Sequence, residues 1–417
     1  MLQSQLFTKV IKEAPKDEIS FNAQALIRAG FIDKLSAGVY TFLPLGLRVL
    51  QKIGQIIREE MDKIGGQELL MPVLIPKENW EQTGRWESFD VLFKLKGVDD
   101  KEFALGATHE EVVTPLMKKF IFSYRDLPAA PYQIQTKFRS ELRAKSGIMR
   151  GREFLMKDMY SFHTADGDLE RFYEVVKHSY FKIFKRCGLE EITYLTYASG
   201  GSFSKYSHEF QALSAAGEDT IHICEKCRVA INQEIIAEQT QCPICGRKDF
   251  RAERAVEVGN IFKLANRFSA PFKLQYLDQA GEKNDVVMGC YGLGLTRLMG
   301  TVVEISHDER GIIWPEEIAP FKVHLLLLGG KESWAENKSR AEKLYEKLQA
   351  EGVEVLYDDR ADMGAGEKFA EADLIGCPIR IVVSDKTLKE DAAEVKKRND
   401  KEVKMVKLNR PAEEFIA

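Results

Sequence analysis

Two charged residues in the stretch KFRSELRA, Arg139 and Glu141, are separated by one position. On a β-strand, residues two apart project from the same face, so a guanidinium and a carboxylate would lie side by side. An arginine can bind a phosphate through two parallel hydrogen bonds and can spread the charge that develops when a nucleophile attacks phosphorus. The alternative interpretation is a surface ion pair, which is the commoner one for an isolated Arg-x-Glu.

Two further stretches supply the remaining parts of a nucleotide site. In RGREFLMKDMYSF, Phe154 offers a ring on which a base could stack, and Met156 and Asp158 share its strand face, although core packing explains Met156 equally well. In GCYGLGLTR, three glycines allow the backbone to approach a ligand closely, and Arg297 follows at the start of a predicted helix, where it could hold outer phosphates. A plain tight corner would use the same glycines. Neither stretch matches the phosphate-binding loop or the dinucleotide fingerprint.

Four of the seven cysteines fall into two Cys-x-x-Cys pairs, Cys224 with Cys227 and Cys242 with Cys245. Four thiolates at this spacing predict a tetrahedral Zn²⁺ site. A metal-free or iron-loaded loop is the alternative. The basic residues nearby are interpreted as a solvated face, and the sequence leaves open whether the loop contacts a nucleic acid.

The bulk composition is typical of a folded enzyme of two or three domains. The chain has 417 residues and a formal net charge of −4, so any nucleic-acid contact has to come from local patches. No apolar run reaches the ~20 residues that a membrane span requires, so no membrane partner is expected. The first residues lack the order of a secretory signal, and we therefore expect a cytoplasmic protein.

The pattern of apolar residues predicts the elements that must position these groups. Apolar residues at steps of three and four from Pro44 predict a long helix that Gly65 ends, followed by a buried strand over LLMPVLI at 69–75. Strands around a polar loop are predicted over 131–163, in an antiparallel sheet. After about Pro320, alternating apolar strands and helices predict a three-layer α/β domain with a mostly parallel core.

The order of these elements resembles the three motifs of class II aminoacyl-tRNA synthetases, and longer strings resemble the bacterial type of prolyl-tRNA synthetase. The resemblance covers nearly the whole chain except roughly residues 220–255. The strings are ATHEEV at 107–112, FRSELRAKSGIMRGREFLMKDMYSFH at 138–163, SHEFQAL at 207–213, EVGNIF at 257–262, GCYGLGLTR at 289–297, DERGIIWP at 308–315, DDR at 358–360 and KFAEADLIGCPIRIVV at 368–383.

The resemblance implies roles for individual residues. Arg139 would bind the α-phosphate and the proline carboxylate, and Arg297 the γ-phosphate, which makes these two the catalytic arginines. The residues that it assigns to ATP are Arg139, Glu141, Phe154, Arg297 and Glu257, the last through Mg²⁺, with a structural carboxylate as the alternative for Glu257. Those that it assigns to proline are Thr108, Glu110, Arg139, Met156, Asp158, His208 and Cys290. Candidates for anticodon contact are Arg360 and Lys368, and the metal ligands are Cys224, Cys227, Cys242 and Cys245.

The expected fold class is α+β: a class II catalytic domain with an antiparallel sheet, a C-terminal three-layer α/β anticodon-binding domain and a small zinc-ribbon-like insertion. The expected boundaries are 1–219 and 254–319 for the catalytic domain, 220–253 for the insertion and 320–417 for the anticodon-binding domain. Expected ligands are ATP, Mg²⁺, L-proline, tRNA(Pro) and a structural Zn²⁺.

The resemblance also implies a homodimer through residues 44–75. Bacterial relatives carry a large inserted domain that hydrolyses mischarged alanyl-tRNA. The interval between the second and third motifs is too short for it here, so editing in cis is not expected and a separate protein could supply it. Two other interpretations stay open: a synthetase-like regulatory protein without aminoacylation, and another class II specificity such as threonine.

Overall fold

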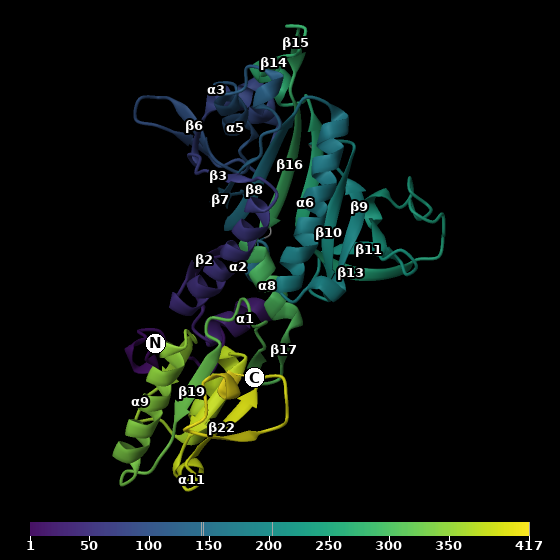
Figure 1. Cartoon of the computed structure of the whole chain (residues 1–417). Helices are drawn as coiled ribbons and strands as arrows, with labels where there is room; N and C mark the ends of the chain where they lie inside the picture. Colours follow the sequence, from purple (N-terminus) through teal and green to yellow (C-terminus); the bar gives the residue numbers. More distant parts are fainter. Residues whose placement is uncertain (143, 145, 202, 417) are drawn as a thin grey trace. The chain divides into compact units, whose positions relative to one another are not determined.

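The structure is a computed structural model that describes residues 1–142, 144, 146–201 and 203–416. Arg143 and Lys145, in the polar loop after Glu141, lie outside these residues. The chain forms two compact units (Figure 1). The first comprises Met1–Lys34, Thr41–Lys52 and Val302–Ala417, and the second comprises Leu35–Tyr40 and Ile53–Thr301. None of the helices in the described part of the chain combines the length and apolar character that a membrane span needs.

A nine-stranded sheet of described residues forms the centre of the second unit. Its order is β10 (Tyr206–Leu213), β9 (Thr193–Ser199), β12 (Val229–Asn232), β11 (Asp219–Cys224), β13 (Arg251–Ala265), β16 (Val287–Gly294), β8 (Glu153–His163), β7 (Pro131–Phe138) and β3 (Gln67–Glu68). Only the pairs β12–β9 and β3–β7 within it are parallel. The expected antiparallel sheet is therefore confirmed.

Helix α6 (Asp166–Arg186) covers one face of this sheet and lies along β8, β13 and β16 (Figure 1). Its buried residues include Tyr173, Tyr180 and Phe184, which fall at the spacing of one helical face. Gly188 follows with a φ of 77°, a left-handed conformation that favours glycine and ends the helix. Because α6 fills this face, a ligand site on the central strands has to use the other face.

That other face is covered by elements drawn from residues 69–128 and 262–290, whose buried apolar residues form two clusters that both contact Val112. These elements include a three-stranded sheet and several short helices. The elements of this region are β4 (Leu74–Pro76), α3 (Lys77–Gln82), α4 (Arg85–Ser88), β5 (Lys94–Lys96), β6 (Glu102–Leu105), α5 (Glu110–Met117), α7 (Ser269–Phe272), β14 (Gln275–Leu277) and β15 (Lys283–Asp285).

The strand predicted over residues 69–75 is only partly present. Helix α2 (Pro44–Asp62) forms as expected, but the segment that follows pairs only at β3 and again at β4. Pro72 has no N–H for a ladder, and the backbone groups of Met71 bond instead to side chains of Gln133 and Gln135. Leu70 is 75% exposed, so the segment is not the buried strand that its apolar run predicts.

The segment with the four cysteines does not form a detached module. Its strands β11 and β12 pair with each other and with β13 and β9, so they extend the large sheet. All four residues of β12 are buried. Cys224 is the last residue of β11, Cys227 lies in the turn that follows, and Cys242 and Cys245 lie in the loop between β12 and β13; residues 224–245 are the cysteine ribbon.

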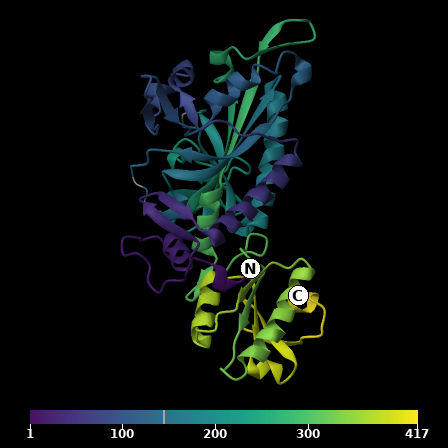
Figure 2. The same ribbon diagram turned by 90° about the vertical axis from the view of Figure 1, so that its left-hand side faces the viewer.

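A five-stranded sheet with helices on both faces forms the centre of the first unit (Figure 2). Strands β20, β19 and β21 are parallel, and β22 and β23 continue the sheet in antiparallel pairing. Leu325 on β19 faces α9, whereas Leu326 packs with Ala372 of α10 on the opposite face. The three-layer prediction is thus confirmed. The elements are β19 (Val323–Leu327), α9 (Trp334–Ala350), β20 (Val355–Asp358), α10 (Ala365–Ile375), β21 (Ile379–Val383), α11 (Asp385–Leu388), β22 (Ala392–Lys397), β23 (Lys404–Lys407) and α12 (Glu413–Ile416).

The N-terminal residues belong to this first unit. Leu2 forms a parallel bridge with Tyr357 at the edge of the sheet, and the side chain of Gln3 bonds to His324 and Glu371. The remaining elements of the chain are α1 (Phe21–Arg28), β1 (Ile32–Ser36), β2 (Val39–Phe42), α8 (Leu295–Ile305), β17 (His307–Asp308) and β18 (Gly311–Ile312).

Candidate active site

A cavity of about 250 Å³ opens on the face of the large sheet away from α6. It is lined by Arg139, Glu141, Glu257 and Arg297, among others. An adjoining cavity shares these four and adds Phe154 and Met156. The structure therefore brings together all five residues that the sequence assigns to a nucleotide.

Backbone and side-chain contacts hold Arg297 at the start of α8. Its Nε donates to the carbonyl oxygen of Met149 at 3.0 Å, and its Nη1 donates to the backbone and carboxylate oxygens of Glu257 at 2.9 and 3.0 Å. Asn260 donates to the other carboxylate oxygen of Glu257 at 2.7 Å. The orientation of this arginine is therefore set before any ligand binds.

Arg139 follows directly after β7 and lies over the ring of Phe154, 5.2 Å from its centroid. Among the described residues, its Nε and Nη2 donate to the carbonyl oxygen of Ala107 alone, at 3.4 Å. Burial and then the charge of Arg297 lower the pKa of Arg139. Two cations that repel each other across one cavity favour an anionic ligand between them.

Glu141 is already bonded, because Arg150 donates to its Oε2 from Nε and Nη2 at 3.1 and 2.9 Å. Arg150 also pairs with Glu218 on the cavity rim. These contacts hold the Glu141 carboxylate on the cavity wall.

The glycines of β16 serve two different faces. A Cβ on Gly292 would lie 2.7 Å from Oδ1 of Asn260, and Gly292 lines the adjoining cavity, so its missing side chain leaves space there. A Cβ on Gly289 would instead meet Tyr291 and Ser161 on the α6 side. The expectation that Gly289 opens space for a ligand is therefore corrected: it makes room for packing against the helix.

A second group of buried polar residues lies next to Arg139, beyond Ala107. Glu110, at the start of α5, is fully buried and accepts hydrogen bonds from the Thr108 hydroxyl and, at 3.4 Å, from the Cys290 thiol. Arg85 of α4 pairs with the same carboxylate at 3.2 Å. Three residues expected to bind an amino acid thus come together, beside the charged side chain of Arg85, which sequence reasoning did not find.

Asp158 is held by a separate set of partners. Its carboxylate lies 2.7 Å from the ammonium of the fully buried Lys137 and accepts from Gln133 and Tyr160 at 3.0 Å each. Lys137 also donates to Nδ1 of His109 at 2.7 Å. Burial, and then Lys137, lower the pKa of His109 to about 4, so the imidazole is neutral.

His208 does not belong to this group. It is paired with Ile261, which is paired in turn with Tyr291, so these three side chains share one face of the sheet. Cys290, the neighbour of Tyr291, points to the opposite face. His208 bonds to the hydroxyl of Tyr173 on α6 at 2.7 Å, and its assignment to the proline pocket is corrected.

Sequence reasoning missed several buried charges beside the expected residues. Lys137 and Glu209 have an indirect signal, because each is a charged residue inside a β-strand, one face of which is expected to be buried. Burial, and then Glu257, raise the pKa of Glu209 to about 8. Arg85 and Glu111 carry no comparable signal, since nothing local distinguishes them from surface charges.

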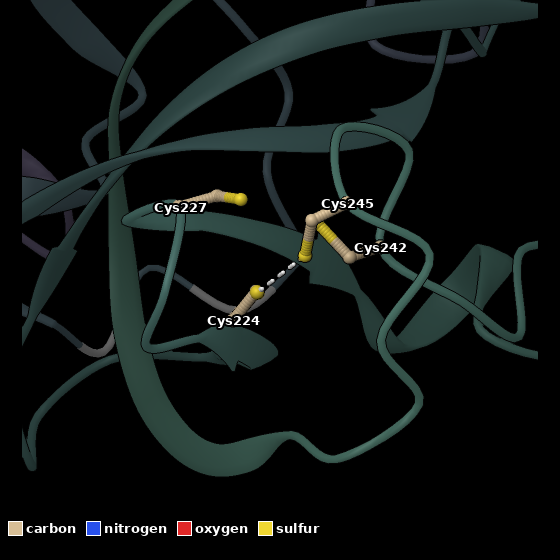
Figure 3. A group of neighbouring side chains, drawn as sticks. All are labelled: Cys224, Cys227, Cys242 and Cys245. Atoms are coloured by element: carbon tan, nitrogen blue, oxygen red, sulfur yellow. Dashed lines mark hydrogen bonds between the residues drawn. The ribbon is translucent and has the colours of Figure 1, made fainter.

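The four cysteines converge as their spacing predicts (Figure 3). Their Sγ atoms all lie within 4.8 Å of one another, and those of Cys224 and Cys245 are 3.7 Å apart. Four sulfurs at ~2.3 Å from one tetrahedral ion would be separated by about 3.8 Å. Cys224 and Cys242 are buried, while Cys227 and Cys245 are partly exposed. The donor set and its spacing therefore fit a tetrahedral metal ion.

The two residues proposed for anticodon contact are both committed to other partners in the first unit. Arg360 pairs with Asp358 and Glu371 at 2.8 and 2.7 Å and keeps 18% of its side chain exposed. Lys368 is fully buried and donates to the carbonyl oxygen of Leu327 at 2.9 Å. Because its ammonium does not reach the surface, Lys368 is withdrawn as a direct contact.

Two protein families match the chain. The tRNA synthetase class II core domain (G, H, P, S and T) matches residues 93–306, and the anticodon binding domain matches residues 322–417. A proline--tRNA ligase of Dehalococcoides mccartyi is 34% identical over 568 aligned positions, which span 100% of this chain and 98% of the relative. This chain belongs to the proline--tRNA ligase family.

Another member of the proline--tRNA ligase family, from Exiguobacterium sibiricum, is 35% identical and is aligned over 93% of this chain and 94% of its own length. These alignments are longer than the 417 residues of this chain, so the relatives have residues for which it has none. The fold is also that of the Giardia lamblia prolyl-tRNA synthetase in complex with prolyl-adenylate. The TM-score is 0.77 at 20% identity, with 94% of this chain and 75% of that chain covered.

Replacing Lys137 by Met tests the buried charge pair, because it would leave the Asp158 carboxylate buried without its cation. We expect K137M to lower the free energy of unfolding by about 3–5 kcal/mol, measured by urea denaturation. Adding D158N should recover part of this loss. The control K263M removes an exposed pair with Glu170 and should cost at most ~1 kcal/mol. A K137M variant as stable as the wild type would contradict the prediction that Lys137 compensates the buried charge of Asp158.

Proposed function

We propose that this chain activates L-proline with ATP to form prolyl-adenylate and then transfers proline to the 3′ end of tRNA(Pro). The observation that carries the proposal is the position of Arg139. It lines the two adjoining cavities without a carboxylate partner among the described residues, and its guanidinium lies 3.4 Å from the carbonyl oxygen of Ala107, three positions before the buried Glu110. An anionic nucleotide and a cationic amine would thus meet at one guanidinium.

On the nucleotide side, Arg139 would hold the α-phosphate and Arg297 the γ-phosphate. Phe154, whose ring lies on the cavity wall, would stack on the adenine, and Glu141 would accept a hydrogen bond from the adenine amino group. Glu257 would hold Mg²⁺, which shields the charge of the phosphates when a carboxylate approaches them. This arrangement fits a site that works by positioning and charge stabilisation.

On the amino-acid side, Glu110 would accept hydrogen bonds from the secondary ammonium of proline. The hydroxyl of Thr108, which donates to Glu110, would orient the Glu110 carboxylate. Cys290 and Met156 supply walls for the small ring, and Arg139 would bind the proline carboxylate. Asp158, which Lys137 already neutralises, is placed to shape the pocket and not to carry its charge.

The reaction then needs no protein nucleophile. A carboxylate oxygen of proline attacks the α-phosphorus, the bond from that phosphorus to the bridging oxygen breaks, and pyrophosphate leaves. In the second step a ribose hydroxyl of the terminal adenosine attacks the acyl carbon, and AMP leaves as the ester forms. The first unit, whose residues 322–417 match the anticodon binding domain, would bind the other end of the tRNA.

The same proposal includes a homodimer. Leu70 and Leu74 are 75% and 49% exposed in the segment that follows α2, which favours a homodimer through residues 44–75. A molecular mass of one chain at micromolar concentration would contradict this.

The same proposal includes the absence of editing activity in this chain. A pocket for proline excludes a smaller side chain by only about 1–3 kcal/mol, so alanine would be mischarged and a separate protein would correct it unless misacylation is tolerated. Hydrolysis of alanyl-tRNA by the purified chain well above the spontaneous rate would contradict this.

Amino-acid-dependent ATP–pyrophosphate exchange across the twenty amino acids tests the adenylation step. We expect exchange with proline, and we expect R139A to lower kcat/KM by at least about 100-fold, since it removes the charge at the reacting phosphate. The control R171A changes an arginine on α6 that is 76% exposed and should leave exchange unchanged. Exchange with threonine in place of proline would show that threonine is the substrate. No exchange with any of the twenty amino acids would favour a regulatory protein without aminoacylation.

The four cysteines are proposed to hold a structural Zn²⁺. Protein purified without added metal should contain about one zinc per chain, and C242S should lose it, while C377A, outside the cluster, should keep it. Removal of the metal should lower the thermal unfolding midpoint, because zinc ties the turn after β11 to the loop at 242–245. Metal analysis that finds neither zinc nor any other ion, or finds iron, would contradict the assignment.

A further inference from the structure

Arg85 is a buried arginine shared by two buried carboxylates. Only 4% of the residue is exposed, and its Nη1 lies 3.2 Å from Glu110 and 3.1 Å from Glu111, both of which are fully buried. The proposed function uses Glu110 but leaves Arg85 and Glu111 without a role. Holding three charges out of water is costly, so their arrangement calls for a physical explanation.

The surroundings of Arg85 restrict its partners to these two carboxylates. Among the described residues, its ion pairs are with Glu110 and Glu111 alone. The rest of the guanidinium faces aromatic rings, with the centroids of Phe89 and Phe203 at 4.2 and 5.2 Å. The arginine therefore cannot exchange its carboxylates for solvent, and it fixes the position of Glu110 from behind.

A single cation between two carboxylates leaves one negative charge. If Glu110 were paired with Arg85 alone, the two would neutralise each other, and a substrate ammonium would gain little from approaching. Glu111, which also accepts from the hydroxyl of Thr83 at 2.8 Å, supplies the compensating charge. The neighbouring pair of Lys137 and Asp158 is neutral by itself.

We propose that Arg85 and Glu111 are positioning residues that set the charge of the amino-acid pocket. Arg85 orients Glu110, and Glu111 neutralises Arg85, so that Glu110 keeps one uncompensated negative charge for the ammonium of the substrate. This inference rests on the proposed function of Glu110. It adds that specificity for a monocationic amino group depends on a pair of residues behind the pocket.

The same arrangement gives proline binding a pH dependence. The groups that face Glu111 are Arg85 from α4, Glu110 from its own helix and the hydroxyl of Thr83. Burial raises the pKa of Glu111 to about 7 against the opposing effect of Arg85. As the pH falls through this value, Glu111 takes up a proton, the charge of the cluster goes from −1 to zero, and the KM for proline rises. Above it, KM is constant.

The experiment measures kcat and KM for proline by ATP–pyrophosphate exchange in the wild type, E111Q and the double variant R85M/E111Q. E111Q makes the cluster neutral and should raise KM for proline by about tenfold or more, with a smaller effect on kcat. R85M/E111Q removes one charge of each sign from the wild type, restores the net charge of −1 and should recover much of the lost affinity. A purely structural role predicts the reverse order, because the double variant removes more contacts.

Controls separate the possible causes. E87Q changes an exposed glutamate of α4 and should leave KM unchanged. Thermal unfolding of each variant identifies loss of folding. The pH profile of KM in the wild type needs no substitution, and between about pH 6 and 8.5 it should show the rise on the acid side that E111Q lacks.

The outcomes are distinguishable from failure of the proposed function. If the wild type shows no exchange with proline, the proposed function itself fails. If exchange is normal but KM is independent of pH in the wild type, or if E111Q binds proline as the wild type does, this inference is overturned. A double variant worse than E111Q would also overturn it.

Discussion

A charge taken out of water has to be matched by an opposite charge or by hydrogen bonds, and the amino-acid pocket is organised by this constraint. Asp158 is matched by Lys137, whereas Glu110 and Glu111 share Arg85. Each partner comes from a different element, so the pocket forms only when β7, β8, α4 and α5 are packed together. Its shape and its charge therefore arise in the same folding step.

The cavity around Arg139 and Arg297 is arranged differently. Arg297 is paired there with Glu257, and Arg150 with Glu141 and Glu218, whereas Arg139 has no ion pair among the described residues. The cavity is open, so water stabilises the charge of Arg139 until an anion replaces it. A buried carboxylate for a small cation thus lies near an open cavity in which Arg139 can receive a large anion, which suits the two substrates of the proposed adenylation reaction.

The cysteine ribbon is part of the same sheet as the site. Strand β11 begins at Asp219, which bonds to Gln211 beside Glu209, and ends at Cys224. Asn232, at the end of β12, donates to Glu209 at 3.2 Å. The hairpin thus runs from the cysteines to the carboxylates around the nucleotide cavity. The ribbon is therefore part of the large sheet that carries the candidate active site.

The sequence alone determined the features that depend on local pattern. Helical spacing defined α2, the pairs of cysteines defined their cluster, and alternation placed Phe154, Met156 and Asp158 on one strand face. The motifs that carry the family resemblance identified residues that line the two adjoining cavities, because those residues are tied to characteristic neighbours in the chain.

Only the tertiary structure decided which face of the sheet each strand presents to the ligand and which charges are buried. His208 turned to α6 because the pairing of β10 with β13 places it beside Ile261, and no local pattern contains that register. Lys368 became a core residue, and Arg85 became the partner of residues 25 and 26 positions away. Strand period and helix period act between near neighbours, whereas burial and charge compensation depend on segments that meet only in the folded chain.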